Sequence, residues 1–315
     1  MKIRQFLLNL FDRDSRAITC ALVLLVLAVV TPNVSIPRST YDYIVVFDIS
    51  QSMGVEDYEL NGAPTSRLDY ARAAARRALS DLPCGSRVGW GVFAEYRTLL
   101  LLAPVEVCDN YNDLVASLDL IDGRMRWANA SEIMKGVYWS MRTAKEVAGR
   151  PSLIFLTDGQ EAPPIDPSYP PQMFEDLKAG EVHGWLMGTG GAAPKRIPRT
   201  DDEGRRIGYW QSYDVLQRFG AGTADNPSAQ PREHLSGLRE AHLKTLAKQV
   251  GFDYARLESQ NSISIAMQDS RFAQRARAPT DISGWLAAAA LALLALRFVP
   301  RPRLRPALGQ LPHKP

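Results

Sequence analysis

The sequence predicts an α/β protein with a doubly wound, mostly parallel sheet and one antiparallel hairpin at the edge of that sheet. Short, continuous apolar runs such as 43–47 (YIVVF) and 153–156 (LIFL) are typical of strands that are covered on both faces. Segments with apolar residues at helical spacing, such as 67–82, lie between these runs. The alternation of the two kinds of segment indicates parallel strands that are joined by helices.

The elements of this domain can be placed in chain order. They are strand 43–47, a polar loop, helix 67–82, hairpin strands 87–94 and 98–103, helices 112–120 and 131–147, strands 153–156 and 183–187, helix 237–250 and strand 252–257. Residues 190–231 are rich in Gly, Pro and charge, so we expect them to form an inserted loop or hairpin. The domain is expected over 38–270, with a linker over 271–281.

Two apolar segments flank this domain and predict transmembrane helices. Residues 17–36 carry no charge, and residues 282–299 are interrupted only by Arg297. At about 1.5 Å per residue, each segment is long enough for a hydrocarbon core of roughly 30 Å. A cleaved signal peptide is the alternative for the first segment, and a buried amphipathic helix for the second. The preceding Asp12 and Asp14 and the absence of an A-x-A cleavage site favour an uncleaved anchor.

The net charge of +3 is too balanced for a nucleic-acid-binding protein, but its distribution predicts a topology. Residues 1–37 carry four basic and two acidic side chains, and residues 282–315 carry five basic and no acidic ones. The remaining residues, 38–281, therefore have a net charge of −4. Because basic flanks stay on the cytoplasmic side, we expect the N-terminus (1–16) and the Arg/Pro tail (300–315) in the cytoplasm. The domain is then expected on the periplasmic side of a bacterial inner membrane.

Cys84 and Cys108 flank the predicted hairpin at its open end. Paired positions of an antiparallel hairpin have a constant sum of residue numbers, and the two cysteines fit a hairpin with its tip at Tyr96. A disulfide at this place is geometrically plausible, and it would require an oxidising compartment. Two free, buried thiols are the alternative.

Polar side chains follow two of the predicted strands and indicate a metal site. Asp48, Ser50 and Ser52 come directly after the first strand, and Asp158 follows the strand 153–156. The carboxyl ends of parallel strands meet at one edge of a sheet, where Ser131 can add a third hydroxyl. These hard oxygen ligands suit Mg²⁺, with Mn²⁺ or Ca²⁺ as alternatives, and argue against zinc. The alternative interpretation is that the serines cap a helix and that Asp158 belongs to a turn.

The segments FDISQSM and FLTDG, together with the Ser131 loop, resemble the von Willebrand factor A (VWA) domain with its metal-ion-dependent adhesion site (MIDAS). This resemblance implies that Asp48, Ser50, Ser52, Ser131 and Asp158 hold Mg²⁺ or Mn²⁺. It also implies that a protein partner offers an acidic residue to the open coordination position. Ser131 stands where the family usually has Thr, so the hydroxyl is retained.

The segments SRLDYARAA, LPCGSRVGWGVF, DGRMRW and TDGQEAPP are similar to bacterial membrane-bound VWA proteins of the MoxR-associated, MxaL-like type. That resemblance implies an accessory role in the assembly or metal loading of a periplasmic enzyme such as methanol dehydrogenase, alongside a MoxR-type AAA+ ATPase. Two other classes stay open, a phosphate-hydrolysing enzyme with Asp48 as nucleophile and a structural scaffold with a vestigial metal site. Such phosphatases need a second acid where Ser50 stands, so we expect no enzymatic activity and no catalytic residues.

Overall fold

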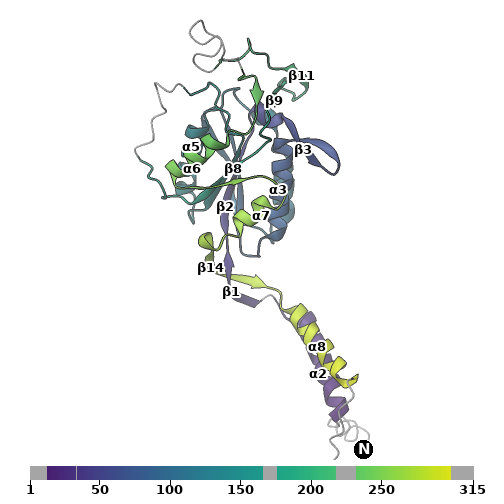
Figure 1. Ribbon diagram of the computed structural model, residues 1–315. Coiled ribbons are helices and arrows are strands. Elements are labelled where there is room, and N and C mark those ends of the chain that lie inside the picture. The colour runs from purple at the N-terminus through teal and green to yellow at the C-terminus, as the bar shows by residue number, and fades with distance from the viewer. Residues whose placement is uncertain (1–12, 33, 166–175, 218–231, 299–315) are drawn as a thin grey trace, which may run out of the picture. The chain divides into compact units, whose positions relative to one another are not determined.

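The computed structural model describes residues 13–32, 34–165, 176–217 and 232–298 of the chain (Figure 1). The predicted tail 300–315 and most of the predicted N-terminal segment 1–16 lie outside the described residues. The chain divides into two compact units, one over 37–278 and the other formed by 1–36 with 279–315.

A six-stranded sheet forms the centre of the unit 37–278. Its strands are β2 (Asp42–Asp48), β5 (Arg87–Ala94), β6 (Arg97–Glu106), β7 (Ser152–Thr157), β8 (Gly184–Gly188) and β13 (Asp253–Arg256). Their spatial order is β13-β8-β7-β2-β5-β6, and every neighbouring pair is parallel except β5 with β6. The prediction of a mostly parallel sheet with an antiparallel hairpin at its edge is therefore confirmed.

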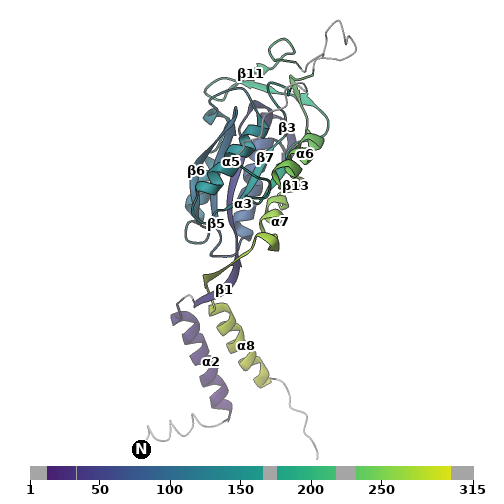
Figure 2. The ribbon, with the colours of Figure 1, turned by 90° about the vertical axis from the view of Figure 1, so that its left-hand side faces the viewer.

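Helices cover both faces of this sheet (Figure 2). They are α3 (Arg67–Asp81), α4 (Tyr111–Asp119), α5 (Ile133–Glu146), α6 (Glu240–Val250) and α7 (Ser262–Met267). Side chains alternate along β2, so that Val45 and Phe47 pack with α3, α4 and α7. Ile44 and Val46 point the other way and pack with α5 and α6. Both faces of β2 are thus buried, which explains its uninterrupted apolar run.

The hairpin β5–β6 differs in register from the prediction. Near its tip Ala94 pairs with Arg97, so the paired residue numbers add up to 191, whereas at the open end Arg87 pairs with Glu106, which gives 193. Two irregularities of the β-bulge kind lie between these pairs, and each adds a residue to β6. A single constant sum of 192 with the tip at Tyr96 is therefore wrong.

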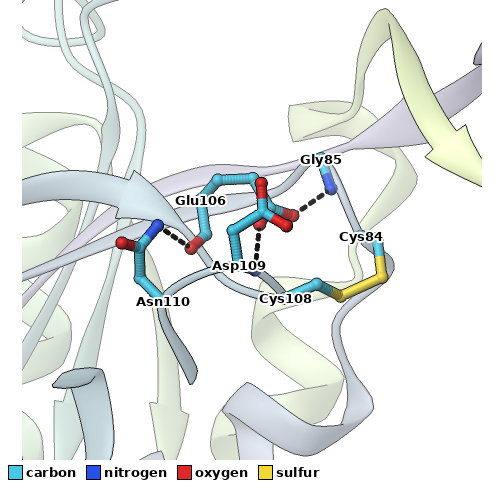
Figure 3. The surroundings of a disulfide bond; sticks show 6 residues. All are labelled: Cys84, Gly85, Glu106, Cys108, Asp109 and Asn110. Carbon is cyan, nitrogen blue, oxygen red and sulfur yellow. Dashed lines mark hydrogen bonds between the residues drawn. A yellow bond between two sulfur atoms is a disulfide. The ribbon is translucent and has the colours of Figure 1, made fainter. Parts of the chain in front are cut away.

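The open end of the hairpin nevertheless holds the disulfide that the sequence allows. Cys84 and Cys108 are bonded, with 5.3 Å between their Cα atoms (Figure 3). The Glu106 carboxylate accepts hydrogen bonds from the backbone N–H groups of Gly85 at 2.5 Å and Asp109 at 2.6 Å. Glu106 and the two cysteines form a compact group of metal-ligand types, but the sulfur atoms are consumed by their mutual bond. This group therefore has a structural role, because it links the two strands at the open end of the hairpin.

Several shorter elements were not expected from the sequence. They are the 3₁₀ helices η1 (Gln51–Gly54), η2 (Gly123–Met125) and η3 (Ser270–Phe272), the hairpin β3 (Glu56–Leu60) and β4 (Ala63–Ser66), the strands β9 (Lys195–Arg196), β10 (Pro198–Thr200), β11 (Arg206–Tyr209) and β12 (Leu235–Ser236), and the pair β1 (Val34–Thr40) and β14 (Gln274–Thr280). The predicted insert thus contains small hairpins, with residues 218–231 outside the described part. The predicted linker contains β14, which pairs with β1.

The two predicted transmembrane spans are corrected by the structure. Helix α2 (Arg13–Val30) begins within the charged leader and ends before Pro32, because proline disfavours helical backbone in the residue that precedes it. Helix α8 (Ser283–Phe298) has 16 residues. Within the described residues, no helix combines the length and the apolar character that crossing a bilayer requires. The two helices pack against each other, and many of their apolar side chains are exposed.

Candidate metal centre

The first loop of the candidate site follows the carboxyl end of β2. Asp48 is the last residue of the strand, and its side chain is completely buried. Its Oδ1 atom accepts a hydrogen bond from the backbone N–H of Ser50 at 2.9 Å. This turn leads into η1, and it brings the hydroxyl oxygens of Ser50 and Ser52 to 3.1 Å from each other. The D-x-S-x-S spacing therefore places two hydroxyls together in front of one carboxylate.

The second carboxylate comes from the neighbouring strand. Strand β7 is parallel to β2, so Thr157 and Asp158 emerge beside Asp48. Thr157 donates a hydrogen bond from Oγ1 to Asp48 Oδ2 at 2.7 Å, and Asp158 Oδ1 accepts one from the backbone N–H of Gln160 at 2.9 Å. Thr157, whose role the sequence pattern does not reveal, orients the first carboxylate of the site.

Ser131 supplies the third hydroxyl. Its backbone exchanges two hydrogen bonds with Ala162, which fix the residue beside the loop that follows β7. Its Oγ atom is buried and has no hydrogen-bond partner among the described residues. A buried hydroxyl without a partner is unfavourable by roughly 1–3 kcal/mol, which a bound cation would offset.

A cavity of about 260 Å³ adjoins these groups, and Ser50, Ser52 and Ser131 all line it. Asp48 and Asp158 lie behind the hydroxyls, completely buried. The donor set consists of hydroxyl and carboxylate oxygens, which fit a hard divalent cation such as Mg²⁺. The structure therefore brings all five predicted ligands to one edge of the sheet, with the three hydroxyls nearest to the cavity.

Arg67 is a component of the site that the sequence analysis missed. Its side chain is completely buried at the start of α3 and donates to Asp158 Oδ2 at 2.7 Å. It also donates to the Ser236 hydroxyl at 2.6 Å and pairs with Asp57 at 2.7 Å. Ser236 Oγ in turn donates to Asp158 Oδ2 at 2.6 Å. One of the two site carboxylates is thus charge-compensated from within the protein.

Burial governs the electrostatics of Asp48. Loss of hydration and, after it, the negative charge of Asp158 raise the pKa of Asp48 to about 7, although hydrogen bonds from Ser50 and Thr157 oppose the rise. A cation at the hydroxyls would favour the ionised carboxylate. The same burial disfavours the phosphatase alternative, because both oxygens of Asp48 accept hydrogen bonds and the side chain is inaccessible to a substrate.

The other acidic side chains around the cavity are already engaged within the protein. Glu161 accepts hydrogen bonds from Ile133 N at 2.8 Å and lies 3.1 Å from His242 Nε2, so it caps helix α5. Glu233 pairs with Arg239 at 3.2 Å. Both glutamates of the cavity wall are therefore occupied by hydrogen bonds or ion pairs within the domain.

Comparison with known proteins agrees with this architecture. Residues 43–160 match the family described as "von Willebrand factor type A domain". This segment is a von Willebrand factor type A domain. All five predicted ligands, from Asp48 to Asp158, lie within it.

Proteins similar to this chain are found among mycobacteria. A "UPF0353 protein" of Mycobacterium ulcerans is 24% identical over 285 residues, which cover 89% of this chain and 74% of that protein. Another, of Mycolicibacterium paratuberculosis, is 32% identical over 155 residues; these cover 48% of this chain but only 44% of that relative, so the match spans less than half of its length.

Similar solved structures include an "aerotolerance-related membrane protein" from Bacteroides fragilis, at 19% identity and a TM-score of 0.46, with 72% of this chain and 96% of that chain covered. An "uncharacterized membrane spanning protein" from Vibrio fischeri is 18% identical with a TM-score of 0.29, and the match covers 73% of this chain and 94% of that chain.

Proposed function

We propose that the VWA domain is a protein-binding module that depends on a divalent cation, with Mg²⁺ as the first choice and Mn²⁺ or Ca²⁺ as alternatives. The single observation that carries the proposal is the unpartnered, buried hydroxyl of Ser131, which lines the same cavity as Ser50 and Ser52. Asp48 and Asp158 place two buried carboxyl groups at the same edge of the sheet, and Arg67 compensates the charge of Asp158. A bound cation would offer an open coordination position to a carboxylate.

Among the described residues, the acids that line the cavity are already engaged, so we expect that carboxylate to come from a partner. Glu161 and Glu233 at the cavity wall are held by a helix terminus and by Arg239, as described above. Asp214, a third acid of the wall, accepts a hydrogen bond from the backbone N–H of Gln211 at 3.0 Å. Since these acids already make contacts within the domain, we expect the ligand of the cation to be an acidic side chain of another protein. The proposed role is binding and is non-catalytic.

We further propose that the protein associates with a membrane and that its VWA domain faces an oxidising compartment such as the bacterial periplasm. Exposed apolar side chains on α2 and α8, Leu22, Val26 and Leu291 among them, support association with lipid. The Cys84–Cys108 disulfide supports the oxidising compartment.

A finer proposal rests on the sequence resemblance alone. It identifies the partner as a periplasmic enzyme such as methanol dehydrogenase or one of its maturation proteins, acting with a MoxR-type ATPase in assembly or metal loading. Genes for methanol dehydrogenase beside the gene for this chain would support it, and their absence from the genome would refute it.

The metal-dependent role can be tested at Ser131. We expect Mg²⁺ at 100 times its dissociation constant to stabilise the wild-type protein by about 2.7 kcal/mol in thermal or urea unfolding. Ser131→Ala should weaken this response, whereas Ser131→Thr, which keeps a hydroxyl, should retain it. An equal Mg²⁺ response in the wild type and in Ser131→Ala, or no response in the wild type, would contradict the proposal.

A further inference from the structure

The insert between β8 and α6 contributes an apolar wall to the cavity beside the candidate metal centre. Pro163 and Pro164, from the loop that follows β7, line the cavity. So do side chains of the insert, namely Ile197, Trp210, Val215 and Leu216. The cavity is therefore lined by three hydroxyls and also by an apolar wall to which the insert contributes.

Trp210 is held in a fixed position in this wall. Its indole N–H donates to Gln51 Oε1 at 2.7 Å, and the guanidinium of Arg199 lies 4.8 Å from the ring centroid. Gln51 belongs to the first metal loop, and its amide also donates to Asn129 Oδ1 at 2.8 Å, just before Ser131. The ring and the metal loops are thus parts of one hydrogen-bonded frame, and the wall is pre-organised for binding.

The size of the cavity limits what it can hold. Its volume of about 260 Å³ is below the range of roughly 300–1,000 Å³ that is usual for sites of drug-sized molecules. An aliphatic or aromatic side chain suits such a space, and apolar anchors of this kind bind best against a rigid aromatic wall.

We infer that the protein recognises a partner segment in which an acidic residue stands next to a large apolar one, with Trp210 as a specificity-determining residue. The carboxylate would bind at the cation, and the apolar side chain would fill the space between Trp210, Leu216 and Pro164. The inference rests on the proposed function for the carboxylate, and it adds the insert as the element that selects among acidic partners.

Matched peptides test the inference on the full-length protein in detergent. Three capped hexapeptides with glycine flanks carry Asp-Leu, Asp-Ser or Asn-Leu at their centre, and calorimetric titration gives their affinities with and without Mg²⁺. We expect the Asp-Leu peptide to bind at least about tenfold more tightly than the Asp-Ser peptide, because only leucine has an apolar side chain that can pack against the apolar wall of the cavity. This ratio corresponds to about 1.4 kcal/mol. The Asn-Leu peptide should not respond to Mg²⁺.

Variants separate the apolar wall from the metal. Trp210→Ala and Leu216→Ser should lower the Asp-Leu preference to less than about threefold, and in Leu216→Ser the Mg²⁺-induced stabilisation should persist. Leu216 is 73% exposed, so its variant is expected to fold. Tyr213→Ala is the matched control, since Tyr213 is an 85% exposed aromatic residue of the same insert outside the cavity lining.

The outcomes distinguish the two proposals. Equal, Mg²⁺-dependent binding of both aspartyl peptides would overturn the inference and leave the metal-dependent function standing. Undetectable binding of the Asp-Leu peptide by a protein that still responds to Mg²⁺ would also overturn it. Binding of that peptide without any need for Mg²⁺ would instead contradict the proposed function.

Discussion

Raising the pH from about 4 to about 8 without divalent cations should lower the free energy of unfolding of this protein through Asp48. Burial raises the pKa of Asp48 from 3.8 to about 7, so the folded state holds this proton more tightly than the unfolded chain does. The stabilising contribution is therefore complete below about pH 4 and is lost as the pH rises through 7. This difference in pKa between the folded and the unfolded state corresponds to roughly 4 kcal/mol in the free energy of unfolding.

The assay is urea unfolding over this pH range in the presence of a chelator, with Asp48→Asn as the reference. The amide cannot ionise, so the wild type should lose stability relative to the variant as the pH rises. At pH 8, Mg²⁺ should restore the wild type, because a cation at the hydroxyls favours the ionised carboxylate, and it should restore the variant much less. The prediction is refuted if, as the pH rises, the free energy of unfolding of the wild type remains equal to that of the variant or increases relative to it.

Three further variants test other parts of the fold. Cys84→Ser should destabilise the protein by about 3 kcal/mol in urea, because it opens a loop with a sequence separation of 24 residues; reduction of the wild type should have the same effect. Arg67→Met should destabilise by roughly 3–5 kcal/mol, since it leaves buried carboxylates unpaired, and adding Asp158→Asn should recover part of this loss. Gly136→Ala should lower the melting temperature, because the added Cβ would clash with the Phe93 ring.

The candidate ligands could be predicted because simple rules act on them. Asp48 and Asp158 each follow a buried apolar run, and parallel strands bring such positions to the same edge of the sheet. Arg67 could not be predicted in the same way. In the sequence it precedes an apolar stripe and is indistinguishable from the exposed arginines of the same helix, and only the tertiary contacts with Asp57 and Asp158 explain its burial.

Other features depend on effects that the sequence pattern does not display. The bulges of the β5–β6 hairpin change its register locally, which a constant pairing rule cannot include. The strands of the insert are only two to four residues long, too short for alternation to be recognised. Helix α2 ends before Pro32, although the uncharged segment continues to Ile36, because the hydropathy of a segment does not determine where its helix stops.

The contacts of Arg67 also bear on when the site is completed during synthesis. Its guanidinium meets partners that are 10, 91 and 169 residues away along the chain, at Asp57, Asp158 and Ser236. A ribosome-bound chain that ends before Ser236 would still present both carboxylates, but one of the groups that holds Asp158 would be missing. Because long-range contacts form late, the hydrogen bonds that hold Asp158 are complete only after the chain has been made as far as Ser236.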